Sequence, residues 1–414
     1  MEDSNRLFNN LKQFNIFLLS LILIFLINLS YGYFKFLKFN SLEINNTTAT
    51  VENIYPKQNY YILKLSSNDY SFYTSIYENS QNIQQLDRVD IDFITKNISF
   101  IDYIRGFYSK SININKIDTS NSHISNISKY ISSQHQDENI SQLFNALFLA
   151  LPISKELRDH CVDFGVSHLI ALSGFHLGVL AFIVYWIFYF PYSYIHQKYF
   201  PYRNKKYDIL LLSSLFLFSY LLFLGLIPSL LRAFVMYVFA IFLYRNNIKI
   251  LSYGTLVIIL LMIIAFLPKL LFSISLWLSI FGVFYIFLFL QYFSKLNKVI
   301  QFLLFNIWLF LALNPIIYQI FNTASYHQIY SALFTIGFSL FYPIELFLHI
   351  INQGDLLDPI IRLWLNIKAQ LFQTSTSVYF TAYYLILSLL STKFKEIFWL
   401  LNLSFIGFFV YIFI

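Results

Sequence analysis

The sequence predicts a polytopic α-helical membrane protein with a small all-β domain near its N-terminus. Hydrophobic residues make up 57% of the 414-residue chain and charged residues 12%, whereas soluble domains contain about 45–50% and about 25%. Apolar runs recur from Phe14 onward, and a run of about 20 residues is long enough to cross a hydrocarbon layer as a helix. Residues 42–110 interrupt this pattern with short β-rich runs.

The first apolar segment spans residues 14–33, within an N-terminal region of residues 1–41. Arg6 and Lys12 precede this segment, and no small-residue cleavage site follows it. The pattern favours an uncleaved membrane anchor over a signal peptide. Because basic residues stay on the cytoplasmic side, we expect a cytoplasmic N-terminus.

The β-rich region, residues 42–110, is expected to lie on the extracytoplasmic side of the membrane. Its short runs are rich in β-branched and aromatic residues and are separated by polar turns, a pattern typical of strands. The five predicted strands are 48–55, 60–65, 70–74, 88–95 and 98–108, which suit a small barrel or sandwich. Residues 111–141 are dominated by Ser, Asn, Ile and Gln and predict a polar linker.

The remaining residues, 142–414, predict a transmembrane domain. With the first segment, its apolar stretches give about ten transmembrane segments. The nine further spans are 166–190, 208–225, 229–244, 250–268, 270–293, 299–318, 326–350, 374–392 and 396–414.

The charged loops test this count through the positive-inside rule. The loops around Lys198 and Arg203, around Arg245 and Lys249, and around Lys295 all fall on the cytoplasmic side. Lys393 and Lys395 fall on the other side, so one segment after residue 318 is miscounted, re-entrant or broken. The segment 326–350, with His327, Pro343 and Glu345, is the candidate. Residues 356–372 suit an amphipathic helix at the membrane interface.

The densest group of polar and small residues lies at 165–178, with the sequence GVSHLIALSGFHLG. On one continuous helix, the small residues Ala171, Gly174 and Gly178 form a stripe against which a neighbouring helix can pack closely. Ser173 and His176 share another side. The polar groups either hold neighbouring helices or line a translocation path, and the two roles are compatible.

A metal site at this cluster is disfavoured by spacing. His168 and His176 are about 12 Å apart along a straight helix, which is too far to share one ion unless the helix breaks at Ser173-Gly174. Cys161 is the only cysteine, so neither a disulfide within the chain nor a thiolate cluster is expected. We predict no metal and no cofactor.

Arg232 begins another apolar segment, in the sequence PSLLRA of residues 228–233. Two interpretations are open. The side chain can extend to the membrane interface, which the sequence alone favours, or it can contact a phosphate, for which a guanidinium is suited.

Common catalytic motifs are absent from the sequence. It contains no G-x-x-x-x-G-K-[ST] loop, no G-x-S-x-G elbow and no H-E-x-x-H helix. We therefore predict a protein that is not an enzyme and has no catalytic residue.

The polar cluster, together with ELR at 156–158, closely resembles the signature of the ComEC family of competence proteins. Three later stretches follow in the family's order. PSLLRA at 228–233 is similar to its Pro-Ser-x-x-Arg-Ala element, and LFSISLWLSIFG at 271–282 is similar to a segment in which Gln-Leu is usual where Ser275-Leu276 stands here. Residues 321–343 resemble a stretch with a polar opening and a later Pro. Together these cover roughly residues 140–350.

The resemblance implies a bacterial inner-membrane channel that takes up single-stranded DNA during natural transformation. The residues expected to line the DNA path or pack its helices are His168, Ser173, Gly174, His176, Gly178 and Arg232. It also implies that residues 42–110 form an OB-like domain, a fold that binds single strands through basic grooves and stacking aromatics.

Candidate DNA-binding residues in this domain are of two kinds, basic and aromatic. Each aromatic residue can instead belong to the core of the domain. The basic residues are Lys57, Lys64, Arg88, Lys96, Arg105 and Lys110; the aromatic ones are Tyr60, Tyr61, Phe72, Tyr73 and Phe107.

The resemblance also implies partners. The chain ends at Ile414, without the metallo-β-lactamase-like domain of longer members, so degradation of the other strand is assigned to a separate nuclease outside the cell membrane. We expect a competence DNA receptor outside, membrane lipid around the helices, and a helicase-like ATPase or a single-strand-binding protein in the cytoplasm. Self-association is left open.

Two rival functions remain at this stage. One is an intramembrane serine hydrolase, because Ser173-Gly174 resembles the Ser-Gly pair of rhomboid proteases, although Ala171 stands where those carry Gly. The other is a small-solute transporter, which the lack of a visible inverted repeat disfavours.

Overall fold

The computed structural model divides into two compact units, each described here by itself. It describes residues 10–413, except 58, 68, 78–82, 84–86, 118–122, 226, 247–251, 369 and 375. Arg6 and Lys249, on which part of the predicted orientation depends, lie outside the described residues. The β unit consists of Leu7–Ile127 with Leu260–Ser273, and the helical unit consists mainly of Ser128–Ile259 with Ile274–Ile414.

The β unit begins with helix α1 (Leu11–Asn40), which the side chain of Asn10 caps by accepting the N–H of Gln13 at 2.8 Å. At about 1.5 Å per residue, its 30 residues extend beyond the roughly 30 Å of a hydrocarbon layer. Its last turns bury Phe36 and Phe39 in the core of this unit. The predicted first span is thus one part of a longer helix.

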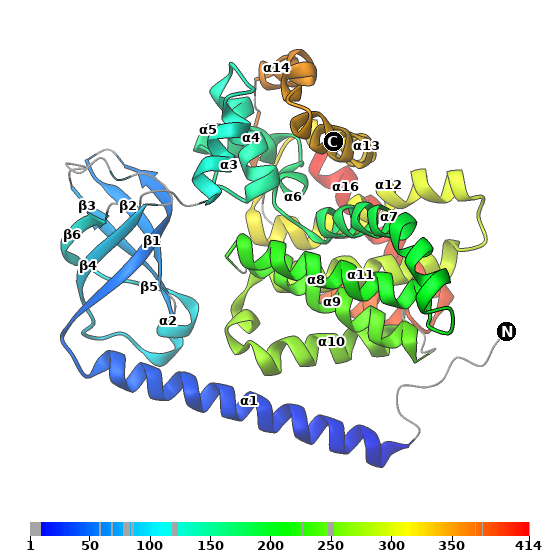
Figure 1. Cartoon of the computed structure of the whole chain (residues 1–414), viewed down its shortest axis with the longest axis horizontal. Coiled ribbons are helices and arrows are strands. Elements are labelled where there is room, and N and C mark those ends of the chain that lie inside the picture. Colours follow the sequence, from blue (N-terminus) through cyan, green and yellow to red (C-terminus); the bar gives the residue numbers. More distant parts are fainter. Residues whose placement is uncertain are drawn as a thin grey trace. The chain divides into compact units, whose positions relative to one another are not determined.

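A six-stranded mixed sheet forms most of the β unit, with the strand order β5-β3-β2-β1-β4-β6 (Figure 1). Its pairs are antiparallel except for β3 with β5. The strands are β1 (Ile44–Pro56), β2 (Tyr61–Ser66), β3 (Ser71–Ile76), β4 (Arg88–Ile94), β5 (Phe107–Tyr108) and β6 (Ser111–Ile117).

Alternation of apolar and polar residues explains this sheet. In β4, Val89, Ile91 and Phe93 are buried while the residues between them are partly exposed. Phe72 of β3 stacks on Phe93 with ring centroids 4.5 Å apart. The inward faces of neighbouring strands therefore share one aromatic core.

Two predictions in this region were wrong. Residues 98–108 form helix α2 (Phe100–Arg105) and the two-residue β5, because Ser99 caps a helix by accepting the N–H of Asp102. Residues 111–141, predicted as a linker, contain β6 and helix α3 (His123–Ser132). Strand β6 is held by antiparallel pairing with β4, a non-local interaction.

The helical unit contains helices of very different lengths, drawn from turquoise through green and yellow to red in Figure 1. Helices α3 and α10 cross the division between the two units. The elements are α4 (Glu138–Leu149), α5 (Lys155–Asp163), α6 (Ser167–Ile170), α7 (Gly174–Tyr199), α8 (Lys205–Phe223), α9 (Pro228–Arg245), α10 (Tyr253–Phe266), α11 (Ile274–Phe293), α12 (Lys298–Phe321), β7 (Thr323–Ala324), η2 (Tyr326–Tyr330), α13 (Ser331–Ile350), η3 (Gly354–Leu357), α14 (Asp358–Leu365), β8 (Phe372–Gln373), α15 (Val378–Leu390) and α16 (Lys395–Phe413). The short helix η1 (Pro268–Phe272) belongs to the β unit.

Seven helical segments in the described part of the chain are long and apolar enough to cross a membrane. They are α1, α7, α8, α11, α12, α13 together with η2, and α16; α10 and α15 are apolar but shorter. The chain is therefore a mostly helical membrane protein. Helices α11, α12, α15 and α16 share an apolar core around Tyr285, Trp308 and Tyr384.

The predicted interfacial helix at 356–372 is shorter in the structure. It consists of η3 and α14, and α14 has only 8 residues. The following residues instead form β8, which pairs with β7 between Thr323 and Gln373.

Candidate functional site

The polar cluster at residues 165–178 is a break between two helices. Helix α6 ends at Ile170, and α7 begins at Gly174 after an irregular segment of three residues. The prediction of a continuous helix over 166–190 was wrong. The stripe of small residues is correspondingly shorter, because Ala171 lies outside α7.

Ser173 and His176 form the cap of α7. The hydroxyl oxygen of Ser173 accepts the N–H of Phe175 at 3.3 Å, and Nδ1 of His176 accepts the N–H of Ser173 at 3.1 Å. This reciprocal pattern satisfies backbone donors that a helix start leaves free. Nδ1 of His176 lies 3.0 Å from the Ser173 hydroxyl, so the two side chains meet as the helical spacing predicts.

His176 is fully buried against α13. Its ring lies edge to face on Tyr342, with centroids 4.6 Å apart, and Phe338 lies 5.5 Å away. Because Nδ1 accepts a backbone N–H, the neutral ring carries its proton on Nε2. That Nε2 has no hydrogen-bond partner among the described residues.

His168 lies on the other side of the break. Its Nε2 is 3.3 Å from the hydroxyl oxygen of Thr335 in α13. His168 is exposed on the helical unit, whereas His176 is buried.

Gly174 brings α7 against α9. A Cβ on Gly174 would lie 3.6 Å from the Cβ of Ala233, whereas a Cβ on Gly178 would meet nothing within 4 Å. Gly174 therefore packs closely against α9, and Gly178 does not take part in close packing. Ala233 belongs to the PSLLRA sequence, so two of the motifs found in the sequence meet here.

Arg232, next to Ala233, is buried with only 5% of its surface exposed. Its Nη2 donates to the Ser275 hydroxyl of α11 at 2.8 Å. Its Nε and Nη1 are buried and have no partner in the described part of the chain. The interpretation that Arg232 extends to the membrane interface is therefore wrong, and the guanidinium keeps two donor nitrogens for another acceptor.

Asp163 organises a buried site that the sequence did not reveal. Its carboxylate accepts from the Ser325 hydroxyl at 2.6 Å, from Nδ1 of His327 at 2.6 Å and from the N–H of Gln370 at 2.9 Å. It ties α5 to the segment before α13. His327 was noticed as a polar interruption, but its partner lies 164 residues away along the chain.

The basic residues proposed for the β unit are dispersed. Lys64 pairs with Glu52 at 2.6 Å and Lys96 with Glu43 at 3.8 Å, and the Arg105 guanidinium lies over the ring of Phe272. Five of the six basic candidates are exposed, namely Lys57, Arg88, Lys96, Arg105 and Lys110.

The aromatic candidates divide into core and surface. Phe72 and Phe107 are buried in the core of the unit, whereas Tyr60, Tyr61 and Tyr73 are exposed. Tyr73 pairs in register with Lys64 on one side and Tyr108 on the other. Tyr108, which the sequence analysis did not select, is 59% exposed.

Reactive thiol or metal chemistry finds little support in the described residues. No group of three or more His, Cys, Asp and Glu side chains among them is placed to hold a metal ion. Cys161 is buried, and burial raises the pKa of its thiol to about 12. The neutral thiol is a poor nucleophile.

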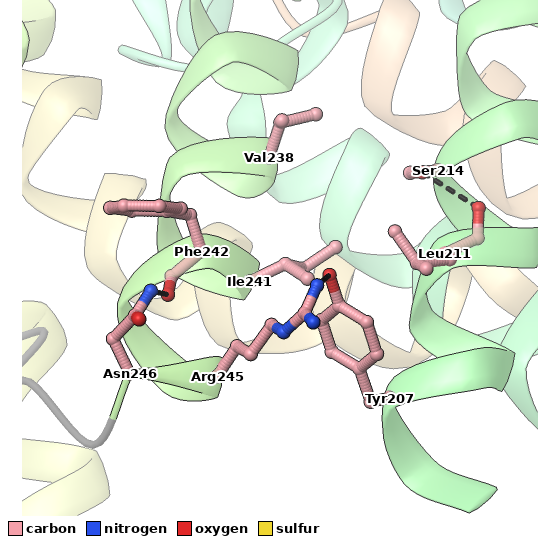
Figure 2. Close-up of a pocket in the computed structure, with 8 residues that line it drawn as sticks. All are labelled: Tyr207, Leu211, Ser214, Val238, Ile241, Phe242, Arg245 and Asn246. Atoms are coloured by element: carbon pink, nitrogen blue, oxygen red, sulfur yellow. Dashed lines mark hydrogen bonds between the residues drawn. The ribbon is translucent and has the colours of Figure 1, made fainter. Parts of the chain in front are cut away.

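Figure 2 shows a pocket between α8 and α9 that contains a second arginine. Nη1 of Arg245 donates to the Tyr207 hydroxyl at 3.1 Å, and the guanidinium lies 4.9 Å from the centroid of that ring. Arg245 is exposed at the last residue of α9, whereas Arg232, the fifth residue, is buried. The same helix thus carries two arginines in opposite environments.

A comparison with known families identifies these motifs. The family model described as Competence protein matches residues 152–414, more than half of the chain. The chain belongs to the competence protein family. This match includes the α6–α7 break, Arg232, Ser275 and His327, and it agrees with the ComEC resemblance of the sequence. No curated protein and no solved structure matches the chain.

Proposed function

We propose that the helical unit is a channel that passes single-stranded DNA across the bacterial inner membrane during natural transformation. In this proposal the chain crosses the membrane about ten times, with its N-terminus in the cytoplasm. Membership of the competence protein family supports a role in DNA uptake. The observation that carries the channel is the buried guanidinium of Arg232.

A buried, unpaired charge is costly in a membrane protein unless it faces protein or a water-filled path. Arg232 has one hydrogen bond, to Ser275, and two buried nitrogens without a partner in the described chain. A DNA strand brings one phosphate charge per nucleotide. A guanidinium binds phosphate through two parallel N–H donors, so a passing strand offers the acceptor that this site lacks.

The break before α7 supports a path beside Arg232. Gly174 at the start of α7 packs on Ala233, the residue that follows Arg232. Non-helical backbone at membrane depth is tolerated where it is buried in protein or lines a cavity. His168 is exposed at this break, which suits a residue along the route of a strand.

The β unit is assigned a receiving role in this proposal, as an OB-like domain outside the membrane. Tyr73 and Tyr108 are neighbours on the sheet surface beside Lys64. Exposed aromatic rings with a nearby cation are suited to stacking bases and attracting phosphates. Tyr73 and Tyr108 are therefore our strongest aromatic candidates.

The proposal treats the chain as a conduit and not an enzyme. A receptor and a separate nuclease would present one strand from outside. A helicase-like ATPase or a strand-binding protein would draw it into the cytoplasm.

A paired substitution on α9 tests the channel. Arg232→Met should reduce labelled DNA in the cytoplasm at least about tenfold, because a desolvated charged contact contributes more than about 1.4 kcal/mol. DNA outside the membrane should remain at the wild-type level. Arg245→Met, which changes the exposed arginine of Figure 2, is the control and should leave uptake near wild type. Normal uptake by a well-expressed Arg232→Met chain would contradict the proposal.

A serine hydrolase remains the second candidate, since Ser173 and His176 lie 3.0 Å apart. The geometry is unfavourable because Nδ1 of His176 already accepts a backbone N–H and has no further lone pair to act as a base. Ser173→Asn separates the two functions, since Asn caps helices about as well as Ser but lacks a hydroxyl nucleophile. Retained DNA uptake supports the channel, and loss of a protease activity would support the hydrolase.

A further inference from the structure

A second group of ionisable side chains lies in the helical unit away from Arg232. It contains His135, just after α3, Glu345 and His349 of α13, and Asp358 at the start of α14. At most 9% of any of these four residues is exposed. These four side chains form a continuous series of contacts. Asp358 lies 2.9 Å from Nδ1 of His135, and Nε2 of His135 lies 3.0 Å from Nε2 of His349. Nδ1 of His349 lies 3.3 Å from Oε2 of Glu345.

The hydrogen atoms in this series can be counted. Nδ1 of His135 faces both carboxylate oxygens of Asp358, and Nδ1 of His349 faces the backbone carbonyl of Glu345 at 2.8 Å. When Asp358 is ionised, both partners are acceptors, so each Nδ1 carries its proton. Neutral rings would then turn two bare lone pairs toward each other at 3.0 Å.

One additional proton resolves this conflict. It can lie between the two Nε2 atoms, or it can lie on Asp358, which then donates to His135 while His135 donates through Nε2 to His349. These states contain the same number of protons and differ only in their positions. The series is therefore built to hold one mobile proton.

Glu345 provides the other end. It is fully buried, and neither carboxylate oxygen makes a hydrogen bond in the described part of the chain. A buried carboxylate without a donor is costly, and Oε2 of Glu345 lies 3.3 Å from Nδ1 of His349, close enough to receive its proton.

We propose that Asp358, His135, His349 and Glu345 form a proton relay. A proton leaves the carboxyl of Asp358 for Nδ1 of His135, the Nε2 proton of His135 moves to Nε2 of His349, and the Nδ1 proton of His349 moves to Oε2 of Glu345. Three bonds to hydrogen break and three form, with no change in oxidation state. The net result is one proton moved from Asp358 to Glu345.

The ring of Phe144 lies against both histidines of the series. The ring of Phe144 stacks on His135, with centroids 4.7 Å apart, and lies 4.5 Å from His349. A side chain at Gly354 would lie 2.9 Å from Nε2 of His349. A glycine is therefore required beside the histidine pair. Arg362 of α14 pairs with Asp137 at 3.9 Å and is not a member of the series.

Chains of His, Asp and Glu inside membrane proteins are typical of proton pathways. The relay goes beyond DNA transport and does not depend on what the channel carries. It provides one route by which a proton gradient acts on the helical unit. A metal ion between the two Nε2 atoms is the competing explanation, although no third ligand of the usual kinds is placed there among the described residues.

The test uses the full chain in liposomes that contain a pH-sensitive dye, with an imposed membrane potential. Wild-type protein should acidify the lumen faster than protein-free liposomes. Glu345→Gln should reduce the protein-dependent rate on the order of 100-fold, because an amide cannot pass the proton. Glu396→Gln, an exposed position at the start of α16, is the matched control and should conduct like wild type. Asp358→Asn, at the opposite end, should reproduce the loss.

Equal proton-dependent rates for wild type and Glu345→Gln, with both proteins folded by thermal unfolding, would overturn the relay. A wild-type rate no higher than that of empty liposomes would also overturn it. Stoichiometric zinc in the purified protein, lost in His349→Gln, would replace the relay by a metal site.

Discussion

The two units of the molecule treat their polar side chains in opposite ways. In the β unit, Lys64 and Lys96 pair with glutamates at the surface, and the core is a cluster of aromatic and aliphatic side chains. In the helical unit, Asp163 and Arg232 are buried among helices that carry apolar side chains on their outer faces. The difference indicates that charged side chains of the β unit serve solubility, whereas buried polar side chains of the helical unit serve specific sites.

The energetic consequence is different in the two units. A surface ion pair contributes about 0–1 kcal/mol, whereas removing one member of a buried, hydrogen-bonded set costs about 3–5 kcal/mol. Substitutions of the same chemical kind should therefore have large effects in the helical unit and small ones in the β unit.

The largest effect on stability is expected at Asp163. Asp163→Ala leaves the Ser325 hydroxyl, His327 and the N–H of Gln370 without their acceptor, so it should destabilise the fold by about 3–5 kcal/mol. Thermal unfolding in detergent measures this. Asp355→Ala, at an exposed position in η3, should stay within about 0.5 kcal/mol of wild type. Similar unfolding temperatures for the two variants would show that the buried Asp163 contributes no more to stability than the exposed Asp355.

An intermediate effect is expected at the cap of α7. Ser173→Ala should destabilise the protein by about 1 kcal/mol, and Ser173→Asn should remain close to wild type. Both values come from the same unfolding measurement. If the Asn variant is as unstable as the Ala variant, Ser173 has a role other than capping.

A small effect is expected at Lys64 in the β unit. Burial tends to lower its pKa, but the hydrogen bond and charge of Glu52 prevail and raise the pKa above 10.5. The stabilisation from this raised value is fully present below about pH 10.5 and is lost as the pH rises through the folded value. Lys64→Met should cost no more than about 1 kcal/mol, measured near neutral pH. A loss as large as that of Asp163→Ala would contradict the comparison.

No reaction at all is expected at Cys161. Because burial raises its pKa to about 12, a membrane-permeant maleimide should leave the folded protein unlabelled near neutral pH and label it after denaturation. Rapid labelling of the folded chain would show that α5 opens readily, and that its buried contacts are weaker than those of the rest of the helical unit.

Local patterns predicted much of the fold. The alternation in β1, β2, β3 and β4 identified four strands, and the apolar runs identified the long helices. Strand β6 was missed because its residues carry weak alternation and depend on pairing with β4, as at Ile91 with Ile114. Helix α2 was taken for a strand because its β-branched and aromatic content outweighed the capping signal of Ser99.

The site was predicted in part. Spacing brought Ser173 and His176 together, and the order of motifs pointed to Arg232. The break at residues 171–173 contains no Pro. Ser173, a residue type that often caps helices, was the local signal for it, and a break at Ser173-Gly174 was considered only as an exception. The partners of Asp163, His135 and Arg232 lie far away in the chain, and a single sequence carries no information about such contacts.

The most direct test of the central claim is to trap the strand in the helical unit. A photoreactive side chain placed at Ala171, which is exposed at the break between α6 and α7, should crosslink labelled single-stranded DNA during uptake. The same group at Leu215, on the exposed apolar face of α8, should crosslink lipid and not DNA. Crosslinking at 171 alone is the result that a DNA path beside Arg232 predicts. Efficient delivery of DNA to the cytoplasm without crosslinking at 171, or with equal crosslinking at both positions, would contradict it.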